Sequence, residues 1–357
     1  MSFKRKIIHF IHGLYYGDAQ YYYIQALNKI FEELNYYAQI YAENTNLENE
    51  QIVKKENINI SKNDVLILHY SNYFPINSIA ADYDCLKILN FQNVTPPIFF
   101  KEYSLELFEQ TSNAYKEFPH IFNKFNYILT HSEFSKNTII EHCGQKLNHK
   151  ITILPLLLNF ERYKKIDFIA YLKKKFKPYK KILFIGRLYP NKRQDLLIEM
   201  MNIIVNQKNK KNYKLFLMGA ALENYFIKLQ KMIDYYSLKD NIVMIPKIVN
   251  ENDIYFHYQT ADIFACASEH EGFCAPLVEA AYYNLPIITF NQDTLKETLC
   301  GKHHYINENI PQNYADAILE FNNIFSKSKI KNDNCEILKI HQNSKNKYLD
   351  FFKKILK

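Results

Sequence analysis

The chain has 357 residues, of which 48% are hydrophobic and 15% aromatic; this composition excludes a disordered chain and predicts two domains of ordinary size. Its net charge of +8 suits polyanionic partners, yet no nucleic-acid motif is present, so no nucleic acid is expected as a partner. Six cysteines without a C-x-x-C pair indicate reduced thiols, and neither a disulfide framework nor a zinc site. Without a long apolar run or a signal-peptide cleavage pattern, we expect a cytoplasmic protein.

Apolar runs in the first half of the chain alternate with helical patterns. A strand at residues 7–11 leads through a glycine-containing loop into a helix at residues 19–34. This loop lacks G-x-G-x-x-G, so a dinucleotide cofactor is not indicated. Further strands are predicted at residues 38–41, 64–71, 86–91, 127–130 and 151–154.

Two polar features of this half have opposed interpretations. His69 would lie at the carboxyl edge of a parallel sheet, where ligands are contacted, but a histidine of the core explains it equally well. Asp82-Tyr83-Asp84 resembles a metal-binding D-x-D, but it precedes a strand instead of following one. We therefore interpret it as a solvated turn and predict that no metal is bound there.

A Lys-rich stretch at residues 161–180 predicts a linker between the first domain, residues 1–160, and the second, residues 181–339. Its positive charge also makes it a candidate contact for an anionic membrane surface. An aromatic stripe between residues 118 and 125 has helical spacing, which indicates either a core-facing or a membrane-facing helix.

In the second half, strands are predicted at residues 182–185, 214–218, 242–245, 263–267 and 287–290, with helices between them and a helical remainder to the C-terminus. The first of these strands is followed by G-R-L-Y-P-N-K. Arg187 and Lys192 would then stand at the carboxyl end of a strand, where two cations suit a diphosphate. The alternative is an ordinary surface Arg and Lys.

Residues 268–279 read S-E-H-E-G-F-C-A-P-L-V-E, with a buried strand before them and Pro276 opening a helix. Free backbone N–H groups at such a helix start favour phosphate. Because carboxylates would repel phosphate, Glu271 and Glu279 are better interpreted as acceptors for sugar hydroxyl groups on either side of it. The alternative is a solvated loop glutamate and an ordinary glutamate of a first helical turn.

This E-x7-E segment, followed by A-A-Y-Y-N-L-P-I-I, resembles the donor-sugar signature of retaining glycosyltransferases of the GT-B fold, glycosyltransferase family 4, also called glycosyl transferases group 1. The resemblance implies an α/β fold with two Rossmann-like domains facing across a cleft. It also implies that a final helix, residues 340–357, packs back on the first domain. Glu271 would contact the transferred sugar and Glu279 the ribose. The backbone of the intervening residues would reach sugar and phosphate: Gly272, Phe273, Cys274 and Ala275.

Other positions match the family residue by residue. Gly186, Arg187 and Lys192 correspond to its G-R-x-x-x-x-K phosphate clamp. A further donor-side counterpart is Gly17 in the first loop, although a plain tight turn explains this glycine equally well. For base recognition the counterparts are Lys247 and Ile248. The segment Gln92-Asn93 stands where many relatives carry His-Asn near the reacting sugar. This departure leaves open which side chain assists at the sugar.

The resemblance implies a retaining hexosyltransferase that uses a UDP- or GDP-sugar and a glycan or lipid-linked acceptor, in synthesis of bacterial surface polysaccharide or lipopolysaccharide. It implies no metal and no other cofactor, with Glu271, Arg187 and Lys192 acting at the reaction centre. Contact with the inner face of the cytoplasmic membrane would then bring the enzyme to a lipid-linked acceptor. Two alternatives remain: a non-catalytic partner subunit, suggested by Gln92, and a nucleotide-sugar epimerase of the same fold.

Overall fold

The computed structural model describes residues 5–47, 52–164, 179–247, 250–321 and 326–356. The chain forms two compact units. The first unit comprises the residues up to Ile98, Glu106–Asn159 and the residues from His341; the second comprises Phe99–Leu105 and Phe160–Ile340. Most of the predicted linker, residues 165–178, lies outside the described residues.

The first unit is built on a six-stranded parallel sheet with the order β2-β1-β3-β4-β5-β6. Its strands are β1 Lys6–Leu14, β2 Tyr37–Thr45, β3 Val65–Tyr70, β4 Leu86–Phe91, β5 Tyr127–Thr130 and β6 Ile151–Ile153. Its helices are α1 Ala19–Glu33, α2 Pro75–Asp82, α3 Leu105–Ile121, α4 Glu133–Cys143 and α14 Ser344–Ile355.

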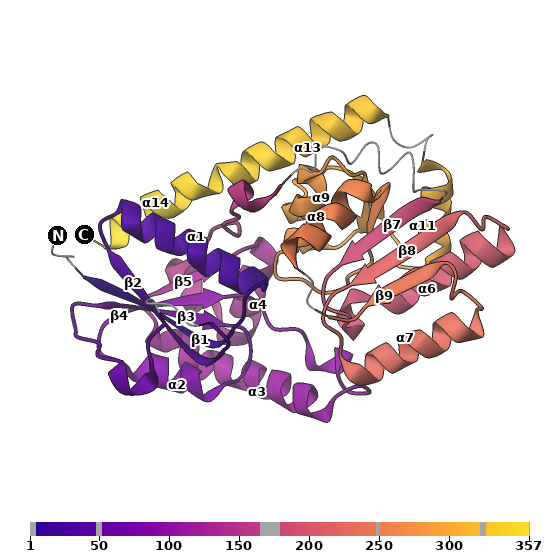
Figure 1. Ribbon diagram of the computed structural model, residues 1–357. Helices are drawn as coiled ribbons and strands as arrows, with labels where there is room; N and C mark the ends of the chain where they lie inside the picture. The colour runs from indigo at the N-terminus through magenta and orange to yellow at the C-terminus, as the bar shows by residue number, and fades with distance from the viewer. Residues whose placement is uncertain (1–4, 48–51, 165–178, 248–249, 322–325, 357) are drawn as a thin grey trace. The chain divides into compact units, whose positions relative to one another are not determined.

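Side chains of the strands alternate between two apolar layers, as the period of a strand requires. Leu66 and Leu68 of β3 pack with α2 and α3, whereas Val65 and Ile67 pack with α1 and α14. Figure 1 shows α1 and α14 on one side of this sheet and α2 and α3 on the other. The sheet is therefore buried on both faces, which explains its nearly continuous apolar runs.

The aromatic stripe of α3 and the turn after it faces the core, so the membrane-facing interpretation of this stripe is wrong. The exposed fractions are 0% for Phe118, 4% for Ile121, 0% for Phe122 and 1% for Phe125. These side chains pack with β3 and β4 in one apolar cluster.

Helix α14 completes the other apolar layer of the first unit. The rings of Phe31 in α1 and Phe352 in α14 lie 4.7 Å apart between centroids. The hydroxyl groups of Tyr23 and Tyr348 are 3.2 Å apart, and both tyrosines are buried. Residues more than 300 positions apart in the sequence therefore share one core.

The second unit is also built on a six-stranded parallel sheet, with the order β12-β11-β10-β7-β8-β9. Its strands are β7 Lys180–Ile185, β8 Tyr213–Met218, β9 Ile242–Ile245, β10 Ile263–Cys266, β11 Ile287–Phe290 and β12 His304–Ile306. Its helices are α6 Gln194–Asn202, α7 Glu223–Tyr235, α8 Glu251–Thr260, α9 Ala275–Tyr282, α10 Asp293–Thr298, α11 Pro311–Leu319 and α13 Lys327–Gln342, the end of which enters the first unit.

The prediction of helix for the whole chain after β11 is wrong at β12. This edge strand has three residues, and Ile306 pairs with Phe290 of β11. A run of three residues is too short to show the period of two by which strands are recognised in a sequence.

Numbered within the second unit, the strand order is 3-2-1-4-5-6, which is that of the Rossmann fold. The order reverses between β7 and β10, its first and fourth strands. In the first unit the reversal lies between β1 and β3. Open α/β sheets bind ligands outside the carboxyl ends of the strands at such a switch point. The topology therefore selects the loops after β7 and β10 as the site of the second unit.

Local sequence signals explain several helix starts. The carboxylate of Asp18 accepts a hydrogen bond from the N–H of Gln20 at the start of α1, and Ser132 caps α4 through the N–H of Ser135. Pro276 lies in the first turn of α9, where its missing N–H costs nothing. These residues therefore determine where each helix begins after the strand before it.

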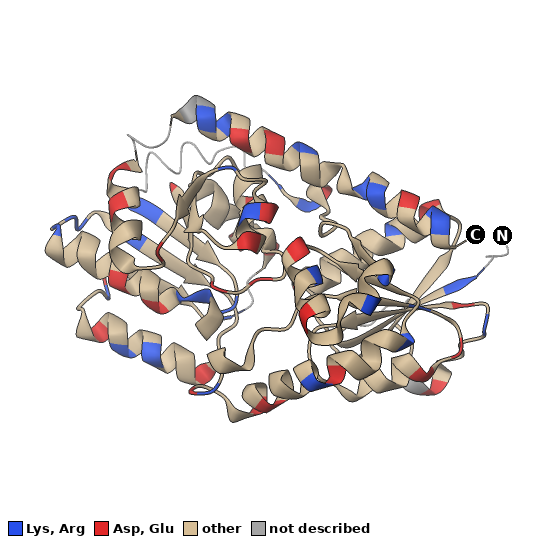
Figure 2. Ribbon diagram, turned by 180° about the vertical axis from the view of Figure 1, so that it is seen from behind, with Lys and Arg blue, Asp and Glu red and all other residues tan. Residues whose placement is uncertain are grey.

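Lys and Arg residues are interspersed with Asp and Glu along the helices of both units, as Figure 2 shows. Within the described ranges, no helix is both long enough and apolar enough to cross a bilayer.

Candidate functional site

Two loops leave the second sheet at its switch point. The first follows β7 and contains Gly186, Arg187 and the turn Pro190–Lys192; the second follows β10 and runs to Cys274, the N-cap of α9. Both loops contain residues that the sequence selected for the donor site. The fold thus brings together segments that are about 80 positions apart in the chain.

Hydrogen bonds join these two loops directly. The N–H of Glu269 donates to the carbonyl of Asn191 at 2.9 Å, and the side chain of Asn191 donates to the carbonyl of His270 at 3.1 Å. The guanidinium of Arg193 also pairs with the carboxylate of Glu269. Asn191 is 2% exposed, so its hydrogen bond is protected from water. These hydrogen bonds and this ion pair therefore fix the position of one loop relative to the other.

Lys192 and Glu271 form an ion pair across the two loops. Lys192 Nζ lies 2.6 Å from Glu271 Oε2, and the side chains are 18% and 11% exposed. Removing one partner of a pair this well shielded leaves a partly buried charge without compensation. The structure thus brings together one of the two predicted cations and the predicted sugar-contacting carboxylate.

Helix α10 fixes the backbone of the second loop. The hydroxyl of Thr294 donates to the carbonyl of Glu271 at 3.0 Å, and that of Thr298 donates to the carbonyl of Phe273 at 2.8 Å. The ring of Phe273 is buried, which further anchors the loop. The start of α9, whose backbone dipoles favour negative charge, is consequently held in place.

Glu279 lies in α9 and is enclosed by three donors of the second unit. Arg162 Nη2 lies 2.7 Å from Glu279 Oε1, and the Tyr163 hydroxyl donates to the same oxygen at 3.2 Å. The Tyr258 hydroxyl donates to Oε2 at 2.8 Å. Burial, and then the neighbouring carboxylate, raise the pKa of both tyrosines well above the usual value, so both remain proton donors.

Sequence reasoning missed these partners of Glu279. Arg162 and Tyr163 fell at the start of the predicted linker, and Tyr258 fell in a short helix without a motif. Arg162 and Glu279 are 117 positions apart in the sequence, so no local sequence pattern predicts their contact. The carboxylate predicted to hold a ribose is paired with an arginine in the structure.

Arg187 is exposed, and its guanidinium lies 5.8 Å from the centroid of the Tyr189 ring. Gly186, the residue before it, lies where the backbone after β7 passes close to the backbone after β8. A side chain at Gly219, which follows β8, would place its Cβ 2.2 Å from the carbonyl oxygen of Gly186. The end of β7 therefore depends on glycine at position 219. Of the two predicted base-recognition residues, Lys247 is exposed and Ile248 lies outside the described residues.

The predicted residues of the first unit occupy the carboxyl ends of its strands. Gly17 adopts a φ of 88° in the turn after β1, a conformation that favours glycine. The N–H of Gln92, after β4, donates to the carbonyl of Tyr70. Asn93 is buried and donates to the hydroxyl of Ser135 at 3.1 Å. Asn93 thus supports the backbone between β4 and α4.

His69 belongs to a buried hydrogen-bonded chain. Its Nε2 lies 2.9 Å from His9 Nδ1, and its Nδ1 lies 3.1 Å from the amide of Asn90. His9 Nε2 in turn lies 2.9 Å from Asn28 Oδ1. Burial, and then the neighbouring histidines, hold the pKa of His69 well below its usual value. This environment favours the core interpretation of His69 that the sequence left open beside the site interpretation.

Salt bridges pair both aspartates of the D-x-D segment with lysines. Asp82 lies 2.7 Å from Lys124 Nζ and Asp84 lies 2.8 Å from Lys62 Nζ. These carboxylates are largely exposed and point to separate partners, as expected of a solvated turn.

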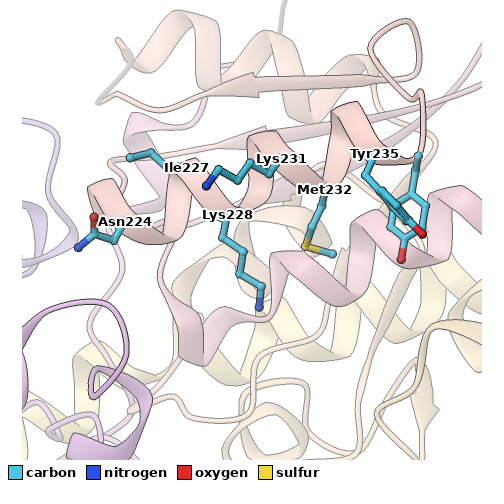
Figure 3. Close-up of a pocket in the computed structure, with 7 residues that line it drawn as sticks. Asn224, Ile227, Lys228, Lys231, Met232 and Tyr235 are labelled. Atoms are coloured by element: carbon cyan, nitrogen blue, oxygen red, sulfur yellow. The ribbon is translucent and has the colours of Figure 1, made fainter.

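A shallow hollow of about 580 Å³ lies along α7 and the residue after it. Figure 3 shows that the side chains labelled there project from α7. Its lining combines lysines with exposed apolar groups: Asn224, Ile227, Lys228, Lys231, Met232, Tyr235 and Tyr236. It contains none of the predicted donor residues and no carboxylate for sugar hydroxyl groups. We therefore place the candidate site at the switch point and not in this hollow.

Solved structures share the fold of this chain. A sucrose-phosphate synthase from Thermosynechococcus elongatus superposes with a TM-score of 0.74 over 98% of this chain and 99% of its own, at 11% identity. Anabaena HepE, solved in complex with UDP and glucose, gives a TM-score of 0.72 over 98% and 100% of the two chains, at 13% identity.

The chain has the GT-B fold.

This GT-B chain also matches a family model over residues 168–336, that of the glycosyl transferases group 1. An uncharacterized glycosyltransferase of Haemophilus influenzae is 30% identical over 112 residues, which are 31% of this chain and 30% of that protein. The chain thus spans about a third of the length of this curated relative. The family match covers both loops at the switch point of the second unit.

Proposed function

We propose that this chain is a retaining glycosyltransferase of family 4 that moves a hexose-type sugar from a UDP- or GDP-sugar to a glycan or lipid-linked acceptor. The observation that carries the proposal is the ion pair of Lys192 and Glu271 between two joined loops at a Rossmann switch point. This is where α/β sheets bind nucleotides. The group 1 match covers both loops.

The two charges of the ion pair suit different parts of one donor. Lys192 would stabilise negative charge that develops on the leaving diphosphate, together with Arg187 and the backbone at Phe273–Ala275. Glu271 would accept hydroxyl groups of the transferred sugar. Because their side chains already lie 2.6 Å apart, the protein need not reorganise to present a cation and an acceptor together.

Glu279 would accept the ribose hydroxyl groups of the same donor. Its Oε1 already receives two donors and its Oε2 one, whereas a carboxylate has about four acceptor positions. The ribose would therefore use the remaining position of Oε2, or would replace Arg162 or Tyr163 at Oε1. In either case Tyr258 keeps the carboxylate oriented.

The leaving phosphate would itself accept the proton of the attacking hydroxyl, so the reaction would need neither a protein base nor a metal. Surface polysaccharide or lipopolysaccharide synthesis, at the inner face of the cytoplasmic membrane, is the setting that we propose. HepE, with UDP and glucose in its structure, supports a UDP-sugar as the first donor to test.

Thermal unfolding in the presence of UDP-, GDP- and ADP-sugars tests the donor proposal. A ligand that binds the native state raises the melting temperature. At one hundred times its Kd it adds about 2.7 kcal/mol to the free energy of unfolding. We expect one nucleotide class to stabilise the wild type and to lose this effect in Glu271→Ala. Binding without transfer to any acceptor would favour the partner-subunit alternative, and conversion of the donor without an acceptor would favour the epimerase. No stabilisation by any nucleotide sugar would contradict all three.

A further inference from the structure

Two thiols and a carboxylate lie close together at the second loop, the one that follows β10. Cys266 is the last residue of β10 and is 1% exposed, and Glu271 and Cys274 follow in the loop. Their two Sγ atoms and one carboxylate oxygen all lie within 4.8 Å of one another. None of the six cysteines forms a disulfide, and within the described ranges this cluster is the one in which two of them meet a carboxylate.

The distances suit a small tetrahedral ion. With metal–sulfur bonds of about 2.3 Å, tetrahedral geometry separates two sulfur ligands by roughly 3.8 Å. Small side-chain movements within the observed 4.8 Å reach that geometry. Two thiolates and one carboxylate form a donor set for Zn²⁺ and related thiophilic ions, with water as fourth ligand, whereas Mg²⁺ and Ca²⁺ prefer oxygen alone.

The charges of the cluster balance when such an ion is present. Two thiolates and the carboxylate of Glu271 carry three negative charges. A divalent ion and the ammonium of Lys192, 2.6 Å from Glu271, supply three positive ones. Lys192 can therefore stay paired with one carboxylate oxygen while the other oxygen binds the metal. A neutral cluster avoids the cost of a net charge in a buried place.

The backbone already holds both loop ligands in place. Cys274 has a φ of 75° and a ψ of 64°, in the left-handed region that favours glycine, so its backbone is strained. The loop keeps this conformation because Thr294 and Thr298 bind the carbonyls of Glu271 and Phe273. Glu271 is partly exposed, which gives an ion a path into the cluster.

We propose that Cys266, Glu271 and Cys274 form a binding site for one thiophilic divalent cation of the Zn²⁺ and Cd²⁺ class. Binding replaces the two thiol protons, which pass to solvent, by two metal–sulfur bonds. The ion takes a carboxylate oxygen of Glu271 that the proposed donor sugar also needs. Metal and donor therefore exclude one another, so the ion inhibits transfer and is not a cofactor. This exclusion rests on the proposed function; the metal site does not.

Titration of the full chain with Cd²⁺ tests the site, because cadmium–thiolate bonds absorb in the ultraviolet. The protein is kept reduced with a phosphine, which competes for the metal less than a thiol would. We expect the wild type to take up one equivalent with this absorption and Cys274→Gly to lose it. Glycine suits a φ of 75°, so this variant removes the ligand and the backbone strain together. Cys274→Ser is a second variant with nearly unchanged volume.

The matched control is Cys335→Ser, which changes an exposed cysteine outside the cluster. This variant should titrate like the wild type, and Mg²⁺ should not displace Cd²⁺. Equal titrations of Cys274→Gly and the wild type, or a wild type without the thiolate absorption, would overturn the proposal.

A second measurement addresses the exclusion. Zn²⁺ at saturation should weaken binding of the stabilising nucleotide sugar by at least tenfold in the wild type, with little effect on whatever donor affinity Cys274→Gly retains. An unchanged donor affinity in the wild type would overturn the exclusion. If no nucleotide sugar binds at all, the proposed function fails, while the Cd²⁺ titration still decides the metal site.

Discussion

The hydroxyl of Tyr258 in α8 donates a 2.8 Å hydrogen bond to Oε2 of Glu279 in α9, and both residues are buried. Hydrogen bonds to charged groups contribute about 1.5–3 kcal/mol to stability. We therefore expect Tyr258→Phe to lower the free energy of unfolding by about that amount and to raise the KM for the donor more than it lowers kcat. Urea unfolding and steady-state kinetics measure the two effects. Tyr235→Phe, at a side chain that is 82% exposed, is the matched control and should change neither. Unchanged stability of Tyr258→Phe would show that this hydrogen bond is not formed in solution.

The ion pair of Lys192 and Glu271 gives a prediction about turnover. Loss of a group that stabilises charge in the transition state lowers kcat by roughly 10²–10³-fold. We expect losses of this order for Lys192→Ala and Glu271→Ala, with the circular dichroism of the wild type retained. Lys231→Ala, which removes an exposed lysine of α7, should keep full activity. Activity like that of the wild type in both site variants would refute the assignment of this pair.

Buried histidines of the first unit make stability depend on pH. Burial lowers the pKa of His9 and of His131 from 6.5 to about 4. Between these values the unfolded chain binds protons that the native state does not, so stability is complete above pH 6.5 and is lost as the pH falls toward 4. Each histidine contributes up to about 3 kcal/mol of this loss.

Urea unfolding at pH 7 and pH 5 measures this pH dependence. His131→Gln does not titrate, so it should reduce the difference in unfolding free energy between the two pH values. His149→Gln, at an exposed histidine, should leave the difference as it is in the wild type. A wild type with equal stability at pH 7 and pH 5 would contradict the prediction.

Gly219 allows the backbones after β7 and β8 to cross. A Cβ at this position would lie 2.2 Å from the carbonyl oxygen of Gly186, so Gly219→Ala must displace the loop that carries Arg187 and Lys192. We expect a loss of at least about 2 kcal/mol of stability together with loss of donor binding. In Gly13→Ala the nearest atom, 3.1 Å away, belongs to the side chain of Tyr15, which can move. Thermal unfolding should therefore separate the two variants, and equal melting temperatures would count against the close crossing.

Much of the fold was predictable because its signals are local. Strands buried on both faces appear as apolar runs, and Asp18, Ser132 and Pro276 mark helix starts through contacts within a few residues. The two donor loops could be identified because their residues match a family pattern at fixed spacing. Strand β12 was missed because three residues carry no period.

The environment of the site was less predictable, since it depends on contacts between distant segments. Nothing near Arg162 in the sequence indicates that it pairs with Glu279, 117 positions away. Cys266 and Cys274 were not recognised as a pair of metal ligands in the sequence, because such ligands are usually recognised by a short spacing such as C-x-x-C. The turn between β10 and α9 brings their sulfur atoms together across eight positions. The left-handed conformation of Cys274 is equally invisible in a sequence, because cysteine has no special preference for it.

The place of α14 in the core of the first unit has a consequence for synthesis on the ribosome. Tyr348 and Phe352 fill space against Tyr23 and Phe31, yet they are translated after all of the second unit. Until they emerge, the nascent first unit exposes an apolar groove along α1, and its folding cannot be completed in the order in which it is made. A growing chain of this protein therefore carries an unfinished, chaperone-accessible surface on its first unit while the second unit is being made.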